Sequence, residues 1–163
     1  RHAWPGEAPP PSRRGAAPSG PLVVPGLYTV RLAAGGVTTE QVVRVKEDPR
    51  LADLDPTIRE QWTQDLVEIT ATLAGAQARA REVAEAVRKL DAGEARASSA
   101  NAAKVRDLDR EFSELASRAS GLRSGVEAWM GPLTADHASQ KAFFAEMLAT
   151  LTREWEGVRG RVR

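Results

Sequence analysis

Apolar residues recur every three or four positions through most of this chain after residue 55. They form three runs, over residues 58–90, 105–129 and 144–162. At about 3.6 residues per turn, this spacing puts the apolar side chains of each run in a stripe along one side of an α-helix. Such a stripe covers a seam but not a whole helix surface, so the pattern predicts three helices that pack against one another.

The side chains expected in this seam fall into three sets, one for each helix. They are Ile58, Trp62, Leu66, Ile69, Leu73, Ala76, Ala80, Val83, Val87 and Leu90; then Val105, Leu108, Phe112, Leu115, Ala119, Leu122, Val126 and Trp129; then Phe144, Leu148, Leu151, Trp155, Val158 and Val162.

Breaks in the runs predict where the helices begin and end. Asp55-Pro56 predicts the first start, because Asp is a favoured N-cap and Pro a favoured first helical residue. Asp91-Ala92-Gly93 interrupts the first run, and Gly131-Pro132 ends the second. Short connections between long helices favour antiparallel neighbours, so we expect an up-down-up bundle over residues 55–163. The candidate N-caps of the later helices are Ser98, Ser99, Thr134 and Asp136.

Three tryptophans occur near predicted helix ends, where an indole N–H can still reach a carbonyl or water. In an up-down-up arrangement, Trp62 and Trp129 share one end of the bundle. Trp155 then lies near the opposite end.

A different pattern, alternation with a period of two, begins at Leu27. Tyr28, Val30 and Leu32 share one face of a strand, while Thr29 and Arg31 take the other. Positive φ angles suit glycine, so a tight hairpin turn is expected at residues 35–36. The return strand is expected from about residue 37 to 46.

On the return strand, Val43 and Val45 are expected to face the same way as the apolar side chains of the first strand. An isolated two-stranded hairpin is marginal in water and needs further strands or a helix over its apolar face. We therefore interpret residues 22–50 as part of a larger sheet whose other strands lie elsewhere.

Residues 1–21 hold six of the ten prolines of the chain. Proline fixes φ and lacks a backbone N–H, so this stretch is predicted to be a Pro/Gly-rich linker or loop. Trp4 is the one large apolar side chain in its first half.

Composition excludes several classes of site. The chain of 163 residues has a formal net charge of +1. This charge gives no electrostatic reason to expect binding to nucleic acid, for which a basic patch should stand out. It has no cysteine, so disulfides and thiolate metal sites are excluded. No run of about 18 apolar residues occurs, so no membrane span is expected.

Candidate reactive residues are few and have plainer explanations. The carboxylates Asp107, Asp109, Glu111 and Glu114 alternate with Arg106, Arg110 and Arg118. Because Arg110 and Glu114 stand at i, i+4, this pattern is typical of a solvated, ion-paired helix face. His2 and His137 have no metal-ligand spacing, and His137 is expected to be exposed in the first turn of the third helix. We predict no catalytic, cofactor-binding or metal-ligating residue in this chain.

A glycine pair and a group of arginines each have a structural and a functional interpretation. Gly121 and Gly125 form a Gly-x-x-x-Gly pair, which we interpret as close packing or simple tolerance rather than as a dimerisation motif. Arg159, Arg161 and Arg163 crowd the C-terminus, where cations suit the helix dipole; contact with a phosphate or an anionic surface is the alternative.

The hairpin carries a family resemblance. Pro25-Gly26-x-Tyr28-x-Val30-Arg31-Leu32, followed by Val43-x-Val45 and Asp48-Pro49-Arg50, resembles the C-terminal region of bacterial sortilin-like proteins. These are secreted β-propellers with BNR (bacterial neuraminidase-type) repeats, often labelled glycosyl hydrolases. Their propeller is followed by an immunoglobulin-like sandwich and a helical tail. The stretch over residues 132–155 is similar to the last helix of that tail.

The resemblance implies that the hairpin is a remnant of an Ig-like sandwich and that its partners are the upstream propeller and Ig-like strands of the same protein. It implies a periplasmic or extracellular location. The Asp-box motif of the repeats, Ser-x-Asp-x-Gly-x-Thr-Trp, does not occur here, so no catalytic residue carries over.

On this basis we expect a non-catalytic spacer or docking module of an exported propeller protein. Two alternatives stay open. The chain is an accessory part of a glycoside hydrolase whose catalytic propeller lies upstream, or it is a helical oligomerisation element that associates with itself or another protein.

Overall fold

The computed structural model spans residues 1–163, and the structure is described for residues 1–6, 19–46, 48–49, 55–129 and 131–162. Most of the predicted linker 1–21, Arg50 at the end of the predicted hairpin segment, and Arg163 lie outside the described residues.

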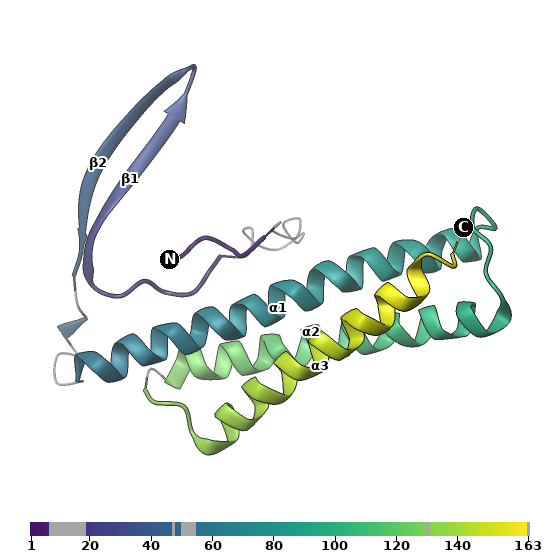
Figure 1. Cartoon of the computed structure of the whole chain (residues 1–163). Coiled ribbons are helices and arrows are strands. Elements are labelled where there is room, and N and C mark those ends of the chain that lie inside the picture. Colours follow the sequence, from purple (N-terminus) through teal and green to yellow (C-terminus); the bar gives the residue numbers. More distant parts are fainter. Residues whose placement is uncertain (7–18, 47, 50–54, 130, 163) are drawn as a thin grey trace.

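Two antiparallel strands, β1 (Gly26–Ala34) and β2 (Val37–Val45), precede three helices, α1 (Pro56–Asp91), α2 (Ser99–Trp129) and α3 (Ala135–Arg159). Figure 1 shows α2 running back along α1 and α3 turning forward again across both. The hairpin stands away from the helices at the end of the bundle where α1 begins, which we call the hairpin end. The predicted mainly α fold, a hairpin ahead of a three-helix bundle, is confirmed.

Side chains and backbone turns set the helix ends largely as predicted. The Asp55 carboxylate accepts the Thr57 N–H at 2.8 Å, which caps α1. Gly93 has a φ of 73°, in the left-handed region, just after α1 ends. Ser98 Oγ accepts the Asn101 N–H at 3.3 Å, and Thr134 Oγ1 accepts the His137 N–H at 3.2 Å. Of the candidate N-caps, Ser98 and Thr134 are therefore the ones used.

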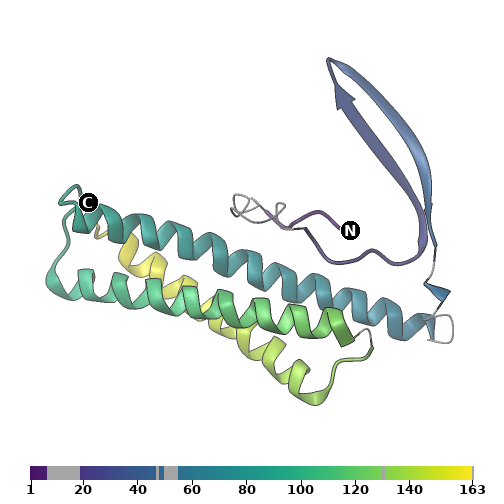
Figure 2. The same cartoon turned by 180° about the vertical axis from the view of Figure 1, so that it is seen from behind.

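The core is the predicted seam, and α2 is its central element. Helix α2 packs extensively on α1 and also carries most of the packing of α3, whereas α1 and α3 touch less (Figure 2). All predicted seam residues of α2 before Trp129 are buried. The half-buried seam residues of the other helices are Ile58, Ala80, Val87, Leu90, Leu148 and Val162.

The tryptophans lie where the up-down-up order requires. Trp62 Nε1 donates to the Val126 carbonyl at 2.9 Å, which joins the start of α1 to the end of α2. Trp129 Nε1 donates to the Pro132 carbonyl at 2.9 Å. Its ring is 58% exposed, so the prediction that Trp129 belongs to the seam is wrong. Val126 is the last buried residue of α2, which ends three residues later at Trp129.

The glycine that permits close helix packing is not one of the predicted pair. A Cβ on Gly121 or Gly125 would meet no heavy atom within 4 Å, so both sit on an open surface and the close-packing interpretation is wrong. A Cβ on Gly75 would instead lie 2.8 Å from Leu148 Cδ2. Gly75 thus lets α3 approach α1, a contact that the sequence spacing did not indicate.

The burial of the seam gives a direct test of the helix faces. Leu115 is fully buried on α2, whereas its neighbour Glu114 is exposed and pairs with Arg118. We expect Leu115→Ala to lower the free energy of unfolding by about 2–5 kcal/mol because it leaves a cavity. Glu114→Ala is the matched control and should change it by less than about 0.5 kcal/mol. Urea unfolding followed by circular dichroism measures both, and equal effects would contradict the assignment of the seam.

Candidate functional surface

The two faces of the hairpin differ in chemistry. The strand register pairs Tyr28 with Val43 and Gly26 with Val45, so the residues predicted to point the same way on the two strands do share one face. We call this the apolar face. Its members are Gly26, Tyr28, Val30, Leu32, Ala34, Val37, Thr39, Gln41, Val43 and Val45, none of them charged. Leu27 and Val42 lie on the other face.

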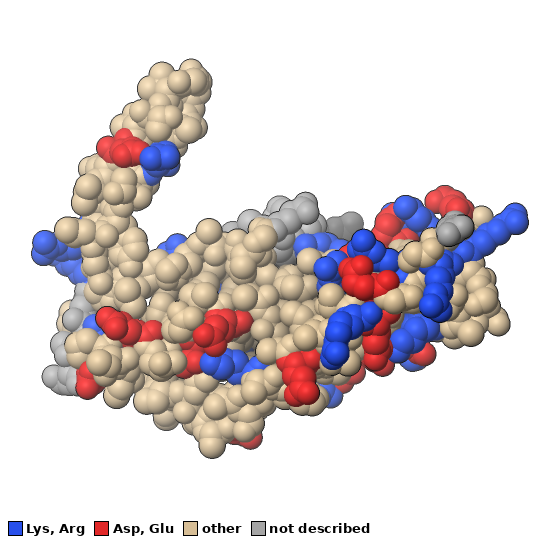
Figure 3. All heavy atoms as spheres, in the orientation of Figure 1, with Lys and Arg blue, Asp and Glu red and all other residues tan. Residues whose placement is uncertain are grey.

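The opposite face carries the charges of the hairpin. Arg31 lies opposite Glu40, and Arg31 Nε donates to the Glu40 carboxylate at 2.6 Å. Arg44 lies on the same face, opposite Leu27. In Figure 3 the hairpin is almost entirely tan, while both charge signs intersperse over the bundle. The charge asymmetry marks the apolar face as the one suited to burial.

The described residues leave most of the apolar face uncovered; Tyr28 and Val45, at its base, are half-buried. Leu32 is 67% exposed, Val37 67% and Val30 52%. Among the described elements, β1 and β2 pack only against each other, so the hairpin touches no helix. The sheet also has only two strands within the described residues, which leaves the outer backbone edge of each strand without a ladder partner.

The base and the tip of the hairpin are each defined by a local feature. The Tyr28 hydroxyl donates to the Val24 carbonyl at 2.6 Å, which ties β1 to the segment before it. At the tip, Gly35 and Gly36 have φ angles of 57° and 79°, the pair of left-handed residues predicted for the turn.

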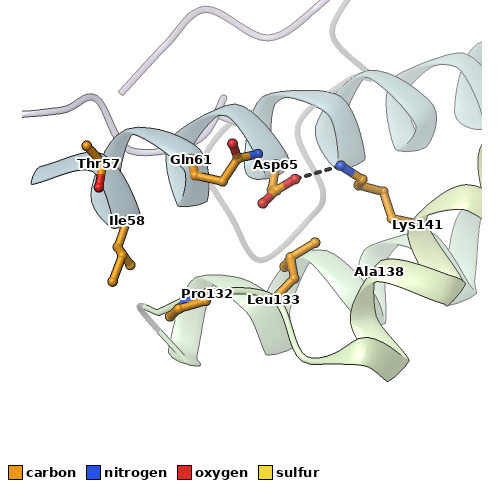
Figure 4. A pocket seen from close by; sticks show the side chains of 8 residues that line it. All are labelled: Thr57, Ile58, Gln61, Asp65, Pro132, Leu133, Ala138 and Lys141. Atoms are coloured by element: carbon orange, nitrogen blue, oxygen red, sulfur yellow. Dashed lines mark hydrogen bonds and ion pairs between the residues drawn. The ribbon is translucent and has the colours of Figure 1, made fainter. Parts of the chain in front are cut away.

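A hollow of about 470 Å³ lies at the hairpin end of the bundle, between the first turns of α1 and α3 (Figure 4). Its lining residues are Thr57, Ile58, Gln61, Asp65, Pro132, Leu133, Ala138 and Lys141. Lys141 Nζ lies 2.6 Å from the Asp65 carboxylate and 2.8 Å from that of Glu68. These three charged groups join α3 to α1, and Asp65 is only 4% exposed.

This charged cluster is suited to holding helices rather than to catalysis. Burial would lower the pKa of Lys141, but its hydrogen bonds to Asp65 and Glu68 outweigh that effect and raise it. The hydrogen bond from Lys141 is the main cause that lowers the pKa of Glu68, with a further contribution from Gln64. Both shifts favour the charged forms, whereas general acid–base catalysis needs a pKa near the working pH.

Among the described residues, two of the four candidate carboxylates on α2 form ion pairs. Asp107 pairs with Arg110, and Glu114 pairs with Arg118 at 2.5 Å. Arg110 therefore turns toward Asp107, three residues before it, and not toward the predicted partner Glu114. Asp109 and Glu111 lie half-buried on the same helix.

The two histidines are brought neither together nor beside a ligand set. His2 is exposed, and His137 is half-buried in the first turn of α3, so the prediction of full exposure is wrong. Among the described residues, no group of three or more His, Cys, Asp or Glu side chains is placed to hold a metal ion. Within the same residues, no helix is both long and apolar enough to cross a membrane.

At the C-terminus, Arg159 pairs with Glu156 at 3.0 Å and with Glu82 of α1 at 3.4 Å. Its charge is thus used to join α3 to α1, which favours the structural interpretation over an anion contact at this residue. Trp155 lies buried beside Glu82 and Ala95, at the end of the bundle opposite the hairpin, as predicted.

The described fold is that of a helical bundle with a projecting β-hairpin. Comparison of the chain with protein-family models, with curated proteins and with solved structures finds no match.

The Asp65–Lys141–Glu68 cluster predicts a pH dependence of stability. Because folding lowers the pKa of Glu68 below its usual 4.5, the stabilisation is complete above pH 4.5 and is lost as the pH falls through the folded value. We expect the thermal midpoint to fall as the pH is lowered below about 4.5, and Glu68→Gln to flatten that fall. Glu60→Gln, on the same helix, is the control. If the thermal midpoint of Glu68→Gln fell at low pH as much as that of the parent, the cluster would not stabilise the bundle.

Proposed function

We propose that this chain is a non-catalytic spacer and docking module of an exported β-propeller protein of the sortilin-like kind. In this proposal the hairpin completes a β-sandwich with strands supplied by the same polypeptide outside residues 1–163. The observation that carries the proposal is the apolar face, which is uncharged along both strands and exposed.

The energetics of the hairpin support this assignment. Each fully buried Val or Leu side chain contributes about 1.5–3 kcal/mol relative to an exposed one. On the apolar face, the three most exposed large side chains are Val30, Leu32 and Val37. A hairpin that leaves these groups in water gains little from folding, so a covering sheet would stabilise it.

The size of the face supports a covalently attached partner. The exposed large apolar side chains on this face are few: Val30, Leu32, Val37 and Val43. A free-standing protein complex usually buries about 800 Å² on each partner. Strands on the same polypeptide do not need that area, because the link gives them a high effective concentration.

The helices support the role of a spacer. Helix α1 has 36 residues, which corresponds to a rod of about 54 Å at 1.5 Å per residue. The core of the bundle is apolar, and ion pairs such as Lys104–Glu154 join neighbouring helices at its surface. A rod of this kind separates its two ends by a fixed distance.

The same negative charge, placed on one face of the hairpin or on the other, tests the docking face. Leu32 and Ala33 are adjacent on β1 and lie on opposite faces. In the longer protein, we expect Leu32→Glu to lower the thermal midpoint and to expose β1 to protease, because a carboxylate cannot be buried unpaired against a second sheet. Ala33→Glu should leave both unchanged. In residues 1–163 alone, neither change should matter, since both positions are exposed there. Equal effects of the two variants in the longer protein would contradict the proposal.

A helical oligomerisation element is the second candidate. The observation that favours it is the exposure of Phe143, at 54%, beside a shallow hollow lined by Gly121 and Leu122. Sedimentation equilibrium of residues 55–163 separates the candidates. A mass that stays monomeric as concentration rises contradicts oligomerisation, and a mass that rises to a dimer supports it.

A further inference from the structure

Two short segments near the N-terminus, residues 1–4 and 19–21, lie against each other and against α2. We call them the N-terminal clasp. The His2 N–H donates to the Pro21 carbonyl at 2.8 Å, and the Arg1 guanidinium donates to the Gly20 carbonyl at 3.2 Å. In Figures 1 and 2 this part of the chain runs beside the bundle before it reaches the base of the hairpin.

Two charged residues of α2 hold the clasp. The Arg123 guanidinium donates to the Ser19 carbonyl at 3.0 Å and lies 5.8 Å from the centre of the Trp4 ring, within cation–π range. Glu127, one turn further along, lies 2.5 Å from the Arg1 guanidinium. The Arg123 side chain is only 16% exposed, so these contacts are partly shielded from water.

The apolar part of the clasp continues the core of the bundle. Trp4 packs against the buried seam, and Pro21 is almost completely buried. Trp4 thus packs against the bundle, a contact that its position in the sequence, far from the helices, did not reveal.

Gly20 makes the close approach of the two segments feasible. A Cβ at this position would lie 2.3 Å from the His2 carbonyl oxygen and 2.6 Å from that of Ala3. Both are backbone atoms, which cannot swing aside as the end of a side chain can. Any larger residue at position 20 must therefore separate residues 1–3 from residues 19–21.

The clasp lies directly before the hairpin. Only residues 22–25 connect Pro21 to β1, and the Tyr28–Val24 hydrogen bond stiffens this connection. On the other side, β2 leads toward the Asp55 cap of α1. The hairpin is thus attached to the bundle near both of its ends.

We propose that the N-terminal clasp is a positioning device that fixes the direction in which the hairpin leaves the bundle. Without it, none of the contacts among the described residues would hold the N-terminal side of the hairpin to the helices, and the direction of the hairpin would be less restricted. With it, the apolar face is presented in one orientation. The use of that orientation for docking rests on the proposed function, but the positioning itself does not.

Distance measurement between spin labels tests the clasp. Because the chain has no cysteine of its own, one pair of spin labels can be attached to cysteines introduced at two chosen positions. Suitable positions are Thr38, near the hairpin tip, and Ser113, on the exposed side of α2. Double electron–electron resonance on the whole chain should give one narrow distance. Gly20→Val and Arg123→Ala should each broaden it, while the helical signal in circular dichroism and the thermal midpoint of the bundle stay close to those of the parent.

Arg118→Ala is the matched control, because Arg118 is an arginine of the same helix that pairs with Glu114 and, among the described residues, makes no ion pair with the clasp. It should leave the distance distribution narrow. A broad distribution in the parent, or an unchanged one in Gly20→Val, would overturn the proposal. The docking variant Leu32→Glu should not alter the distance, so failure of the clasp and failure of the docking function are distinguishable.

Discussion

Burial of the α2 stripe is the interaction on which the rest of the structure depends. Val105, Leu108, Phe112 and Leu115 are completely removed from water between α1 and α3. Because α1 and α3 pack more on α2 than on each other, loss of this stripe would remove the surface that both share. The charged contacts at the ends, such as Lys141 with Asp65, then fix how the helices align rather than whether they associate.

Burial of apolar side chains would stabilise the hairpin as it stabilises the bundle, but in the hairpin these side chains are mostly exposed. The hairpin strands have a well-defined register, a turn made by two glycines and all of their charged side chains on one face. Yet the described residues leave most of the apolar face in water. The bundle is therefore a self-sufficient unit, whereas the hairpin is suited to gaining its stability from a partner. The clasp connects the two, since Arg123 and Glu127 of the bundle hold the segment from which the hairpin emerges.

Patterns in the sequence predicted the structural features that depend on residues close together in the chain. The 3–4 spacing located the seam of α2 residue by residue, and Asp55-Pro56 located the start of α1. The alternation from Tyr28 to Leu32 gave the faces of the hairpin. These features depend on neighbours within one or two turns, so the chain itself displays them.

Features that depend on distant neighbours were missed. Gly75 and Gly121 look alike in the sequence, but only Gly75 faces another helix, because the angle at which α3 crosses decides the contact. Arg123 shows the same difficulty, since its partners Trp4 and Ser19 are more than a hundred residues away. At the candidate site, the alternation of residues in the sequence predicted the uncharged face of the hairpin. No repeating pattern in the sequence predicted the clasp that orients it.

Hydrogen exchange of the whole chain, resolved by residue with NMR, tests most directly whether bundle and hairpin differ in this way. The account predicts that amides of Val105 to Val126 exchange only through global unfolding, while those of Thr29 to Leu32 and Thr39 to Val42 exchange by local opening at much lower free energy. Protection of the hairpin amides equal to that of α2 would contradict it, because the strands would then be stable without the partner that the account requires.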